Sequence, residues 1–185
     1  MFRVLFNTMK KLSLIILLLG TTLISQAQTK NTVTKSSVTY QIKNMGFATA
    51  GKFGGLEANI LFDKAHLATS TIDASVAVKT VNSDDDMRDE HLRKEDFFDA
   101  DHYPKMIMKS TSLKSKSGNN FIGEFDLTIK GKTKRITVPF TYVVKGNTAT
   151  FAGSFKINRL DFGVGDTSVV LSNEVTVFLN VETAI

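Results

Sequence analysis

The chain has 185 residues, of which 42% are apolar and 22% are charged, an ordinary composition for one globular domain. Its formal charge of +5 falls to +2 without Arg3, Lys10 and Lys11, because 20 basic residues then face 18 acidic ones. So small a charge excludes the electrostatic footprint of a nucleic-acid-binding protein. The absence of cysteine excludes disulfide bonds and a lipid-anchored N-terminal cysteine.

The N-terminal segment has the three parts of a secretory signal peptide. Lys10-Lys11 supplies the positive region, Leu12–Ile24 is apolar, and Ser25-Gln26-Ala27 is a small-x-small cleavage site. The apolar run of about 13 residues is shorter than the roughly 20 needed to span a bilayer, which disfavours the alternative of a membrane anchor. We therefore predict a signal peptide over 1–27, cleaved after Ala27, and a mature protein that is periplasmic or secreted.

Alternating apolar and polar residues dominate the rest of the chain and predict strands with one dry and one wet face. Polar residues 28–36 come first and are expected to form a flexible lead-in to a single domain over 37–185. The alternating runs are Val38–Ile42, Ile72–Val78, Phe121–Ile129, Ile136–Tyr142, Phe151–Ile157 and Val175–Val181, with noisier candidates at Leu56–Phe62 and Lys105–Leu113. Gly- and Asn-rich turns separate them, which predicts antiparallel neighbours. A barrel is favoured over a sandwich because closure removes strand edges.

One segment departs from this alternation and predicts a helix. Ser83 and Asp86 form a capping box, and three consecutive aspartates suit the positive end of a helix dipole. Two acid–base pairs spaced four residues apart add support. We predict a short helix over about 84–98. Its few apolar residues do not make a full stripe, so we expect it to lie across the barrel rather than inside it.

Two candidate metal sites have a structural interpretation beside the functional one. Asp84–Asp86 lacks the ligand spacing and glycine turn of a cation-binding loop, so helix capping is favoured. His66, His91 and His102 are far apart in the sequence and show no zinc-binding spacing. A structural hydrogen bond from His91 is favoured over a zinc site. We predict no metal.

Two further groups of charged residues are also open to two interpretations. The basic cluster over Lys130–Arg135 is favoured as a solvated turn over a binding site for a phosphate head group. Arg159 and Asp161, two positions apart on an expected strand, are predicted to share one face and to form a lock at the barrel rim. No nucleophile elbow, P-loop or dinucleotide-binding motif occurs, so we predict no catalytic residues.

Several short motifs occur in a fixed order along the chain. They are Gly46-x-x-x-x-Gly51-x-Phe53, Met87–Arg93 with Asp96–Asp99 and Tyr103-Pro104, Gly123-x-x-x-Leu127-Thr128-Ile129-x-Gly131-x-Thr133-Lys134, and Ile157-x-Arg159-x-Asp161–Val164. In order and spacing they resemble the signature of the YceI-like family, the polyisoprenoid-binding barrels. The resemblance covers about Val38 to Val181.

This resemblance implies an all-β fold, an extended eight-stranded antiparallel lipocalin-like barrel with a short helical insertion. Its interior would hold an isoprenoid chain or a quinone tail, and no other cofactor is implied. Family members are periplasmic or secreted. Met106-Ile107-Met108 stands where the family has an aromatic residue. Methionine is softer and more adaptable, which implies a less defined ligand here.

The side-chain inventory fits an apolar cavity, since 14 phenylalanines accompany only 3 tyrosines and no tryptophan. An eight-stranded barrel has room for one slim ligand. Burying about 20 ligand carbons contributes roughly 16 kcal/mol before association costs of about 4–15 kcal/mol. The predicted cavity-lining residues are Phe53, Leu92, Phe98, Phe125, Leu127, Phe140, Phe155 and Phe162.

Three functions remain open at this point. The favoured one is an exported carrier of an isoprenoid-type lipid that catalyses nothing. The second is an enzyme acting on a lipid in the same cavity, through His91, Arg159 or Asp161. The third is a secreted, stress-related module without a ligand, whose barrel would be packed solid. No nucleic-acid partner and no membrane span of the mature chain are expected, and a dimer is left open.

Overall fold

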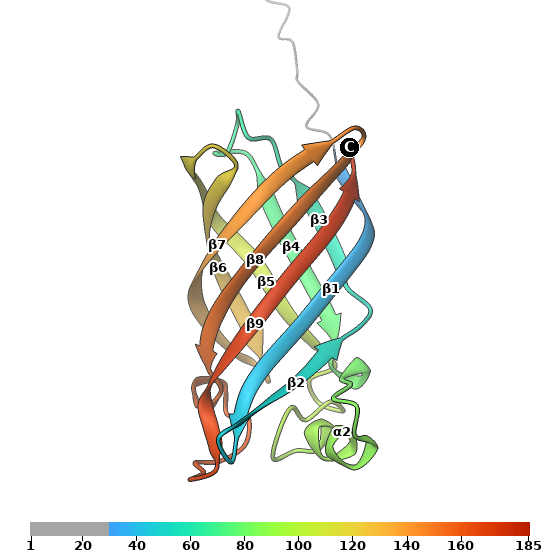
Figure 1. The fold of residues 1–185 in the computed structure, drawn as a ribbon, viewed down its shortest axis with the longest axis vertical. Coiled ribbons are helices and arrows are strands. Elements are labelled where there is room, and N and C mark those ends of the chain that lie inside the picture. Colours follow the sequence, from blue (N-terminus) through green and yellow to red (C-terminus); the bar gives the residue numbers. More distant parts are fainter. Residues whose placement is uncertain (1–29) are drawn as a thin grey trace, which may run out of the picture.

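Nine strands in the computed structural model wind into a closed antiparallel barrel with one short helix at one end (Figure 1), over the described residues 30–185. The strands are β1 Lys30–Asn44, β2 Phe47–Phe53, β3 Glu57–Leu61, β4 Thr71–Ala77, β5 Lys105–Ser117, β6 Asn120–Ile129, β7 Lys132–Lys145, β8 Thr148–Asn158 and β9 Leu171–Ala184. The helical elements are η1 Val78–Thr80, α2 Asp86–Arg93 and η2 Arg159–Phe162. The predicted all-β barrel with a helical insertion is confirmed.

The barrel closes because β1 pairs along both of its edges. One edge pairs with β9 over most of its length. The other edge pairs with β2 near the end of β1 and with β3 at its beginning. Strands β2 and β3 therefore share one position in the wall, and the nine strands occupy eight positions. Every neighbouring pair is antiparallel, so each strand presents alternate side chains to the interior.

The two ends of the barrel are built differently (Figure 1). The helical end carries the β1–β2 and β6–β7 turns, the β8–β9 connection and the segment 78–104 with α2. The opposite end, called here the terminal end, carries the β3–β4 loop, two tight turns and the C-terminus. None of the described helices is long and apolar enough to cross a membrane.

Two boundaries differ from the sequence-based predictions. Residues 30–36, expected within a flexible lead-in, form the first half of β1, because residues 30–31 pair with β3 and the stretch from Thr32 pairs with β9. Polar residues on both faces hide the alternation of this stretch in the sequence. The helix predicted over 84–98 spans only Asp86–Arg93. Its N-cap is Asp85, whose carboxylate accepts from the Arg88 amide at 3.0 Å. The predicted signal peptide, 1–27, lies outside the described residues.

Ser83 does not cap the helix because its polar groups are used elsewhere. Its hydroxyl and its amide both donate to Oδ1 of Asp89, at 2.6 and 2.8 Å. The Nε of Arg88 donates to the Ser83 hydroxyl at 2.8 Å. Asp89 is buried. The capping-box pattern thus marked a real polar cluster at the helix start, but with a different partner for Ser83.

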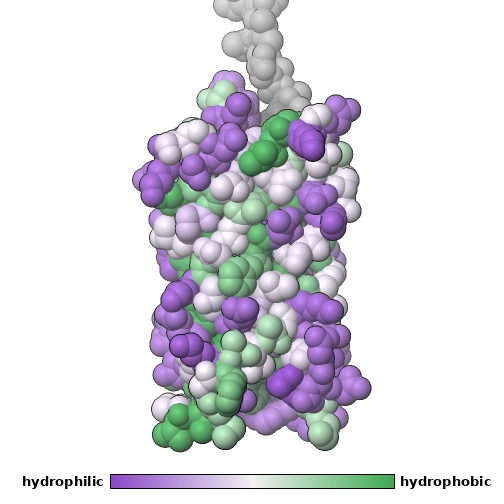
Figure 2. Space-filling model, in the orientation of Figure 1, coloured by the Kyte–Doolittle hydropathy of each residue, from purple (hydrophilic) through white to green (hydrophobic). Residues whose placement is uncertain are grey.

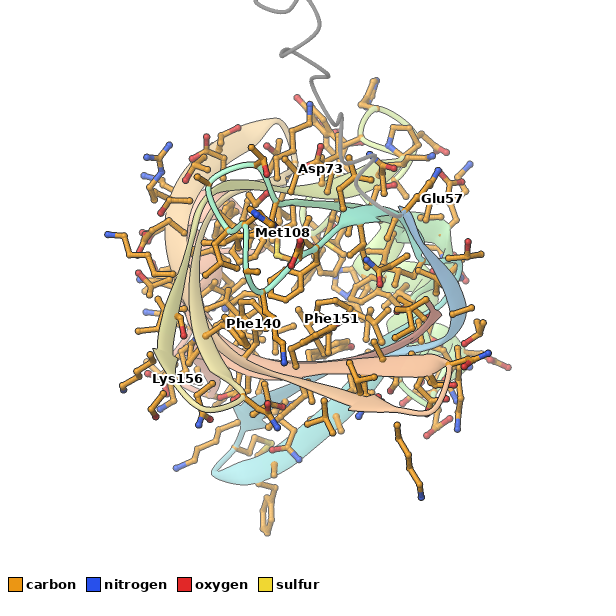
Figure 3. The ribbon with its side chains drawn as sticks, turned by 90° about the horizontal axis from the view of Figure 1, so that it is seen from above. Glu57, Asp73, Met108, Phe140, Phe151 and Lys156 are labelled. Carbon is orange, nitrogen blue, oxygen red and sulfur yellow. The ribbon has the colours of Figure 1, made fainter. Side chains whose placement is uncertain are left out.

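The alternation of the strands separates an apolar interior from a polar exterior. Viewed along the barrel, Met108, Phe140 and Phe151 point inward while Glu57 and Lys156 point away (Figure 3). The face of the barrel drawn in Figure 2 is mostly hydrophilic or intermediate, with scattered hydrophobic side chains and a hydrophobic group at each end. The interior therefore holds the continuous apolar surface available to a lipid-like molecule.

Candidate ligand-binding site

The half of the barrel nearest the helical end encloses a cavity of about 340 Å³. This volume lies at the lower end of the roughly 300–1,000 Å³ found for small-molecule sites. Its wall is overwhelmingly apolar and draws on β1, β2, β4, β5, β6, β8, β9 and the segment around α2. A hollow, apolar interior of this kind can bind a slim hydrophobic molecule, since burial needs no polar partner.

Six of the eight predicted residues line this cavity. They are Phe53, Leu92, Phe98, Leu127, Phe155 and Phe162. Phe53 and Phe98 pack edge to face, with ring centres 5.6 Å apart, and so join β2 to the segment after α2. Whether any of these side chains contacts a ligand stays a prediction.

Phe125 and Phe140, also predicted to line the cavity, are buried in the interior but are not among its lining residues. Phe125 fills the space beside Gly123, where a side chain would collide with its ring. Phe140 stacks on Phe121, with ring centres 5.5 Å apart. Both therefore belong to a filled part of the interior, which strand periodicity cannot distinguish from a hollow part.

The filled part is an aromatic plug near the terminal end, defined here as Phe62, Phe121, Phe140, Tyr142 and Phe151. The ring centre of Phe62 lies 4.7 Å from that of Tyr142, 5.2 Å from that of Phe121 and 5.3 Å from that of Phe151. All five side chains are buried, and none lines the cavity. The barrel is thus hollow at one end and solid at the other.

A few polar side chains line the cavity, and several come from around α2. Arg88 and His91 of the helix lie in the lining together with Tyr40 and Asn44 of β1. Burial raises the pKa of the Tyr40 hydroxyl to about 12, with a further contribution from the negative charge of Asp89. The helical end therefore offers hydrogen-bonding groups to the polar end of a ligand.

Arg159 also lines the cavity, but the predicted Arg159–Asp161 lock is wrong. The strand ends at Asn158, and η2 removes the face-sharing that the prediction assumed. The guanidinium instead donates to the carbonyl oxygens of Val164 at 2.8 Å, Asp166 at 2.7 Å and Ser172 at 3.0 Å. Asp161 does not line the cavity, so the three residues of the enzyme hypothesis do not converge there.

Each histidine pairs with an aspartate. Nε2 of His91 lies 2.6 Å from Oδ2 of Asp96, which confirms the predicted structural hydrogen bond. This hydrogen bond holds the pKa of the Asp96 carboxyl below its usual range. The pairs Asp63–His66 and Asp99–His102 are built in the same way. Over residues 30–185 the structure holds no cluster of three or more metal-ligating side chains.

The basic cluster over Lys130–Arg135 is tied into the fold at two points. Nζ of Lys130 donates to the carbonyl oxygens of Glu95 at 2.6 Å and Gly163 at 3.0 Å, so it joins the segment after α2 to the β8–β9 connection. Arg135 pairs with Asp126 on the neighbouring strand at 2.8 Å. These contacts support the structural interpretation of the cluster.

Several lining residues were not predicted. They include Val38, Ile42, Leu56, Val76, Met106, Met108, Ile129, Ile157, Val177 and Leu179. Most lie on the apolar faces of predicted strands, so the signal was present in the period of two. Met106 and Met108, whose soft side chains imply a less defined ligand, both lie in the cavity wall.

Known proteins with the same fold include several solved structures. The chain aligns with BcnA of Burkholderia cenocepacia at 30% identity and a TM-score of 0.77, over 80% of this chain and 95% of the other. It aligns with the YCEI protein of Campylobacter jejuni at 28% identity and a TM-score of 0.67, over 73% and 84%. A polyisoprenoid-binding domain from Saccharophagus degradans has a TM-score of 0.64 at 14% identity, over 84% and 97%, which supports the fold alone.

Curated relatives extend the similarity at the level of sequence. A UPF0312 protein of Vibrio cholerae is 28% identical over 136 residues, which cover 70% of this chain and 72% of the relative. A UPF0312 protein of Vibrio campbellii is 30% identical over 137 residues, with the same shares covered. The family model described as the YceI-like domain matches residues 30–183, a range that contains every strand of the barrel except the last residue of β9. The chain belongs to the YceI-like domain family.

Proposed function

We propose that this protein is an exported binding protein that carries an isoprenoid-type lipid, a polyprenyl chain or a quinone tail, in its barrel cavity. The observation that carries the proposal is the hollow apolar interior between β1, α2 and β5, whose wall offers almost no polar surface. Apolar burial alone then supplies the binding free energy, at about 0.8 kcal/mol per methylene group.

The nature of the cavity wall favours a branched hydrocarbon chain. The wall combines phenylalanine rings at Phe53, Phe98, Phe155 and Phe162 with aliphatic side chains, and two methionines supply an adaptable surface. The structural neighbour from Saccharophagus degradans is a polyisoprenoid-binding domain. The two chains share only 14% identity. We therefore use that name only to choose the first class of ligand to test, the isoprenoids.

The polar groups at the helical end give such a ligand an orientation. Arg88, His91 and Asn44 lie in the lining near α2 and the end of β1, whereas the lining closest to the aromatic plug is apolar. A molecule with one polar end and one hydrocarbon tail therefore places its polar end at the helical end.

The test is to purify the protein from an exporting bacterial host, extract it with organic solvent and analyse the extract by mass spectrometry. We expect an isoprenoid at close to one molecule per protein. Two variants are compared in the same way. Ala74→Phe fills the cavity from β4, and Phe178→Ala, which truncates an exposed side chain, is the matched control. The first variant should come out empty and the second loaded. An empty extract from well-folded wild-type protein would contradict the proposal.

Export is tested separately by the mass of the purified chain. The predicted cleavage after Ala27 leaves Gln28 as the first residue of the mature protein. Recovery of that species from the periplasm or the medium is the expected result. Retention of the full 185-residue chain with the cells would contradict export and leave the binding proposal intact.

A further inference from the structure

The depth of the cavity is set by side chains that reach across the barrel from opposite walls. Phe62 follows β3, whereas its ring partners Phe121, Tyr142 and Phe151 belong to β6, β7 and β8. In the strand order these three strands lie on the far side of the barrel from β3. Phe62 therefore spans the lumen and closes it at the terminal end.

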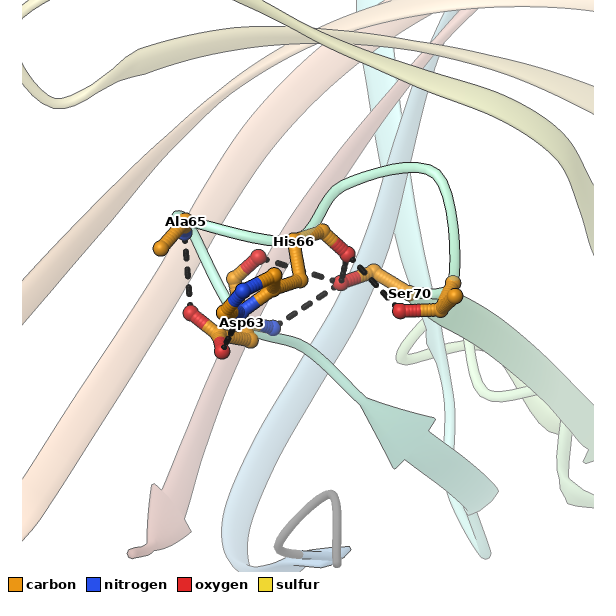
Figure 4. Close-up of polar contacts among 5 residues, drawn as sticks. Asp63, Ala65, His66 and Ser70 are labelled. Carbon is orange, nitrogen blue, oxygen red and sulfur yellow. Dashed lines mark hydrogen bonds and ion pairs between the residues drawn. The ribbon is translucent and has the colours of Figure 1, made fainter. Parts of the chain in front are cut away.

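A folded loop holds Phe62 in this position (Figure 4). The amide of Asp63 donates to the Ser70 hydroxyl at 2.9 Å, and the amide of Ala65 donates to Oδ1 of Asp63 at 2.8 Å. Nδ1 of His66 lies 2.7 Å from Oδ2 of Asp63. Three hydrogen bonds within the loop thus fix the backbone on the C-terminal side of Phe62. The position of the Phe62 ring across the lumen is therefore set by the fold.

The boundary between hollow and filled interior can be located on single strands. Along β6, Leu127 and Ile129 line the cavity, while Phe125 and Phe121 on the same face do not. Along β8, Phe155 lines it and Phe151 does not. Phe125 is therefore the first filled position above the cavity.

The length of the hollow part follows from the strand geometry. The lining on β1 runs from Val38 to Asn44. At about 3.3 Å per residue and a strand tilt of about 40°, this stretch spans roughly 15 Å along the barrel axis. With carbon–carbon bonds of about 1.5 Å, an extended hydrocarbon chain advances roughly 1.25 Å per bond, so that distance holds roughly 13 chain atoms. Each isoprene unit contributes four atoms to the main chain, which makes about three units.

We propose that the aromatic plug, together with Phe125, limits the length of isoprenoid chain that this barrel can bury to about three units. This inference rests on the proposed function and adds a limit on chain length. The tail of the ligand ends against Leu127 and Phe125, and its polar end lies beside Arg88 and His91. A longer chain keeps its tail in the cavity, so its polar end and the units next to it lie outside the barrel, where those units gain no apolar contact with the protein.

The experiment measures affinity against chain length. The purified full chain, or its mature form, is titrated with prenyl alcohols of two, three, four and eight isoprene units, and occupancy is read by native mass spectrometry. Affinity should rise about tenfold or more from two to three units, because each added carbon is buried. It should then level off, with less than about a threefold change from three to eight units.

Two variants test the residues that set the limit. Phe62→Ala combined with Phe125→Ala removes the rings above the cavity, and we expect the plateau to move to four units or more. Phe62→Leu with Phe125→Leu is the milder pair for use if the alanine variants fold poorly, and it should shift the plateau in the same direction. Phe178→Ala removes a ring from the outer face of β9 and should leave the length profile unchanged.

The outcomes separate this inference from the proposed function. If no prenyl alcohol binds, the proposed function fails. If affinity keeps rising from three to eight units in the wild type, binding stands and the length limit is overturned. A plateau at three units that the folded plug variants do not move would overturn the assignment of the limit to Phe62 and Phe125.

Discussion

The guanidinium of Arg159 donates to the carbonyl oxygen of Val164 at 2.8 Å and so ties η2 to the loop that follows it. The same side chain reaches the carbonyls of Asp166 and Ser172. It is only 3% exposed. One buried cation thus satisfies three backbone acceptors in the β8–β9 connection and also forms part of the cavity wall.

We predict that Arg159→Met destabilises the protein by about 3 kcal/mol, because three carbonyl oxygens, including that of the buried Val164, lose their donor. The measurement is the free energy of unfolding from urea denaturation. Arg135→Met is the matched control, since Arg135 makes an exposed ion pair with Asp126 that contributes about 0–1 kcal/mol. Equal losses in the two variants would contradict the role assigned to Arg159.

A second prediction concerns the polar cluster at the start of α2. Asp89 accepts from both the hydroxyl and the amide of Ser83 and is only 4% exposed. Asp89→Ala should cost roughly 1–3 kcal/mol of unfolding free energy, because the Ser83 amide loses its acceptor. Glu90→Ala, which removes only an exposed pair with Lys94, should cost less than about 0.5 kcal/mol.

The coupling between Ser83 and Asp89 can be measured by a double-mutant cycle. Ser83→Ala with Asp89→Ala should lose less than the sum of the single variants, by about 0.5–2 kcal/mol, because either single change already removes the hydrogen bond from the Ser83 hydroxyl to Asp89. Strict additivity would show that Asp89 acts through other contacts.

A third prediction follows from the pair formed by Asp99 and His102. The hydrogen bond from His102 to Asp99, at 2.8 Å, and the charge of that carboxylate raise the pKa of His102 above its ordinary value of 6.5. A histidine pKa that is higher in the folded state stabilises the fold fully below about pH 6.5, and this contribution is lost as the pH rises through the folded value.

The stability difference between wild type and His102→Gln should therefore be largest in mildly acidic solution and shrink toward pH 8. Titration of the His102 ring by NMR should give a pKa above 6.5. In Asp99→Asn the carboxylate charge is gone, so the pKa of His102 should return toward 6.5. A pKa of His102 that does not respond to Asp99→Asn would exclude this pair as the cause.

The barrel could be predicted from the sequence because strand periodicity and short turns are visible in short stretches of the chain. The period of two in Phe121–Ile129 and Val175–Val181 places those residues in β6 and β9, with alternate side chains inside. Antiparallel order followed from short turns, and closure followed from the cost of free strand edges. The pairing of β1 with β9 and β3 is a long-range relationship, and it extends β1 into residues 30–36, which look like a polar tail in the sequence.

The division of the interior into cavity and plug could not be predicted in the same way. Phe155 and Phe151 lie on one face of β8 and are chemically identical, yet the first borders the cavity and the second packs against Phe62. The difference comes from a loop residue after β3 that reaches the opposite wall. Such a contact between distant parts of the chain leaves no periodic trace in the sequence. The same holds for Arg159, whose partners depend on the path of the β8–β9 connection.

The last prediction concerns Gly123, whose missing side chain makes room for Phe125. A Cβ atom at position 123 would collide with the ring of Phe125 and would lie 3.1 Å from Cδ2 of Leu113. Gly123→Ala should therefore cost about 1–3 kcal/mol, the usual cost of overpacking a filled core. Gly54→Ala is the control, because its Cβ would meet only Thr80 at an ordinary 3.7 Å.

Urea denaturation of the two glycine variants gives the comparison, and a second-site change identifies the cause. Phe125→Leu removes the ring that the new Cβ atom would strike, so adding it to Gly123→Ala should cost less than Phe125→Leu costs in the wild type. If the two changes are additive, the collision with Phe125 is not what destabilises Gly123→Ala. A cost for Gly54→Ala equal to that for Gly123→Ala would point instead to a general penalty for replacing glycine in this barrel.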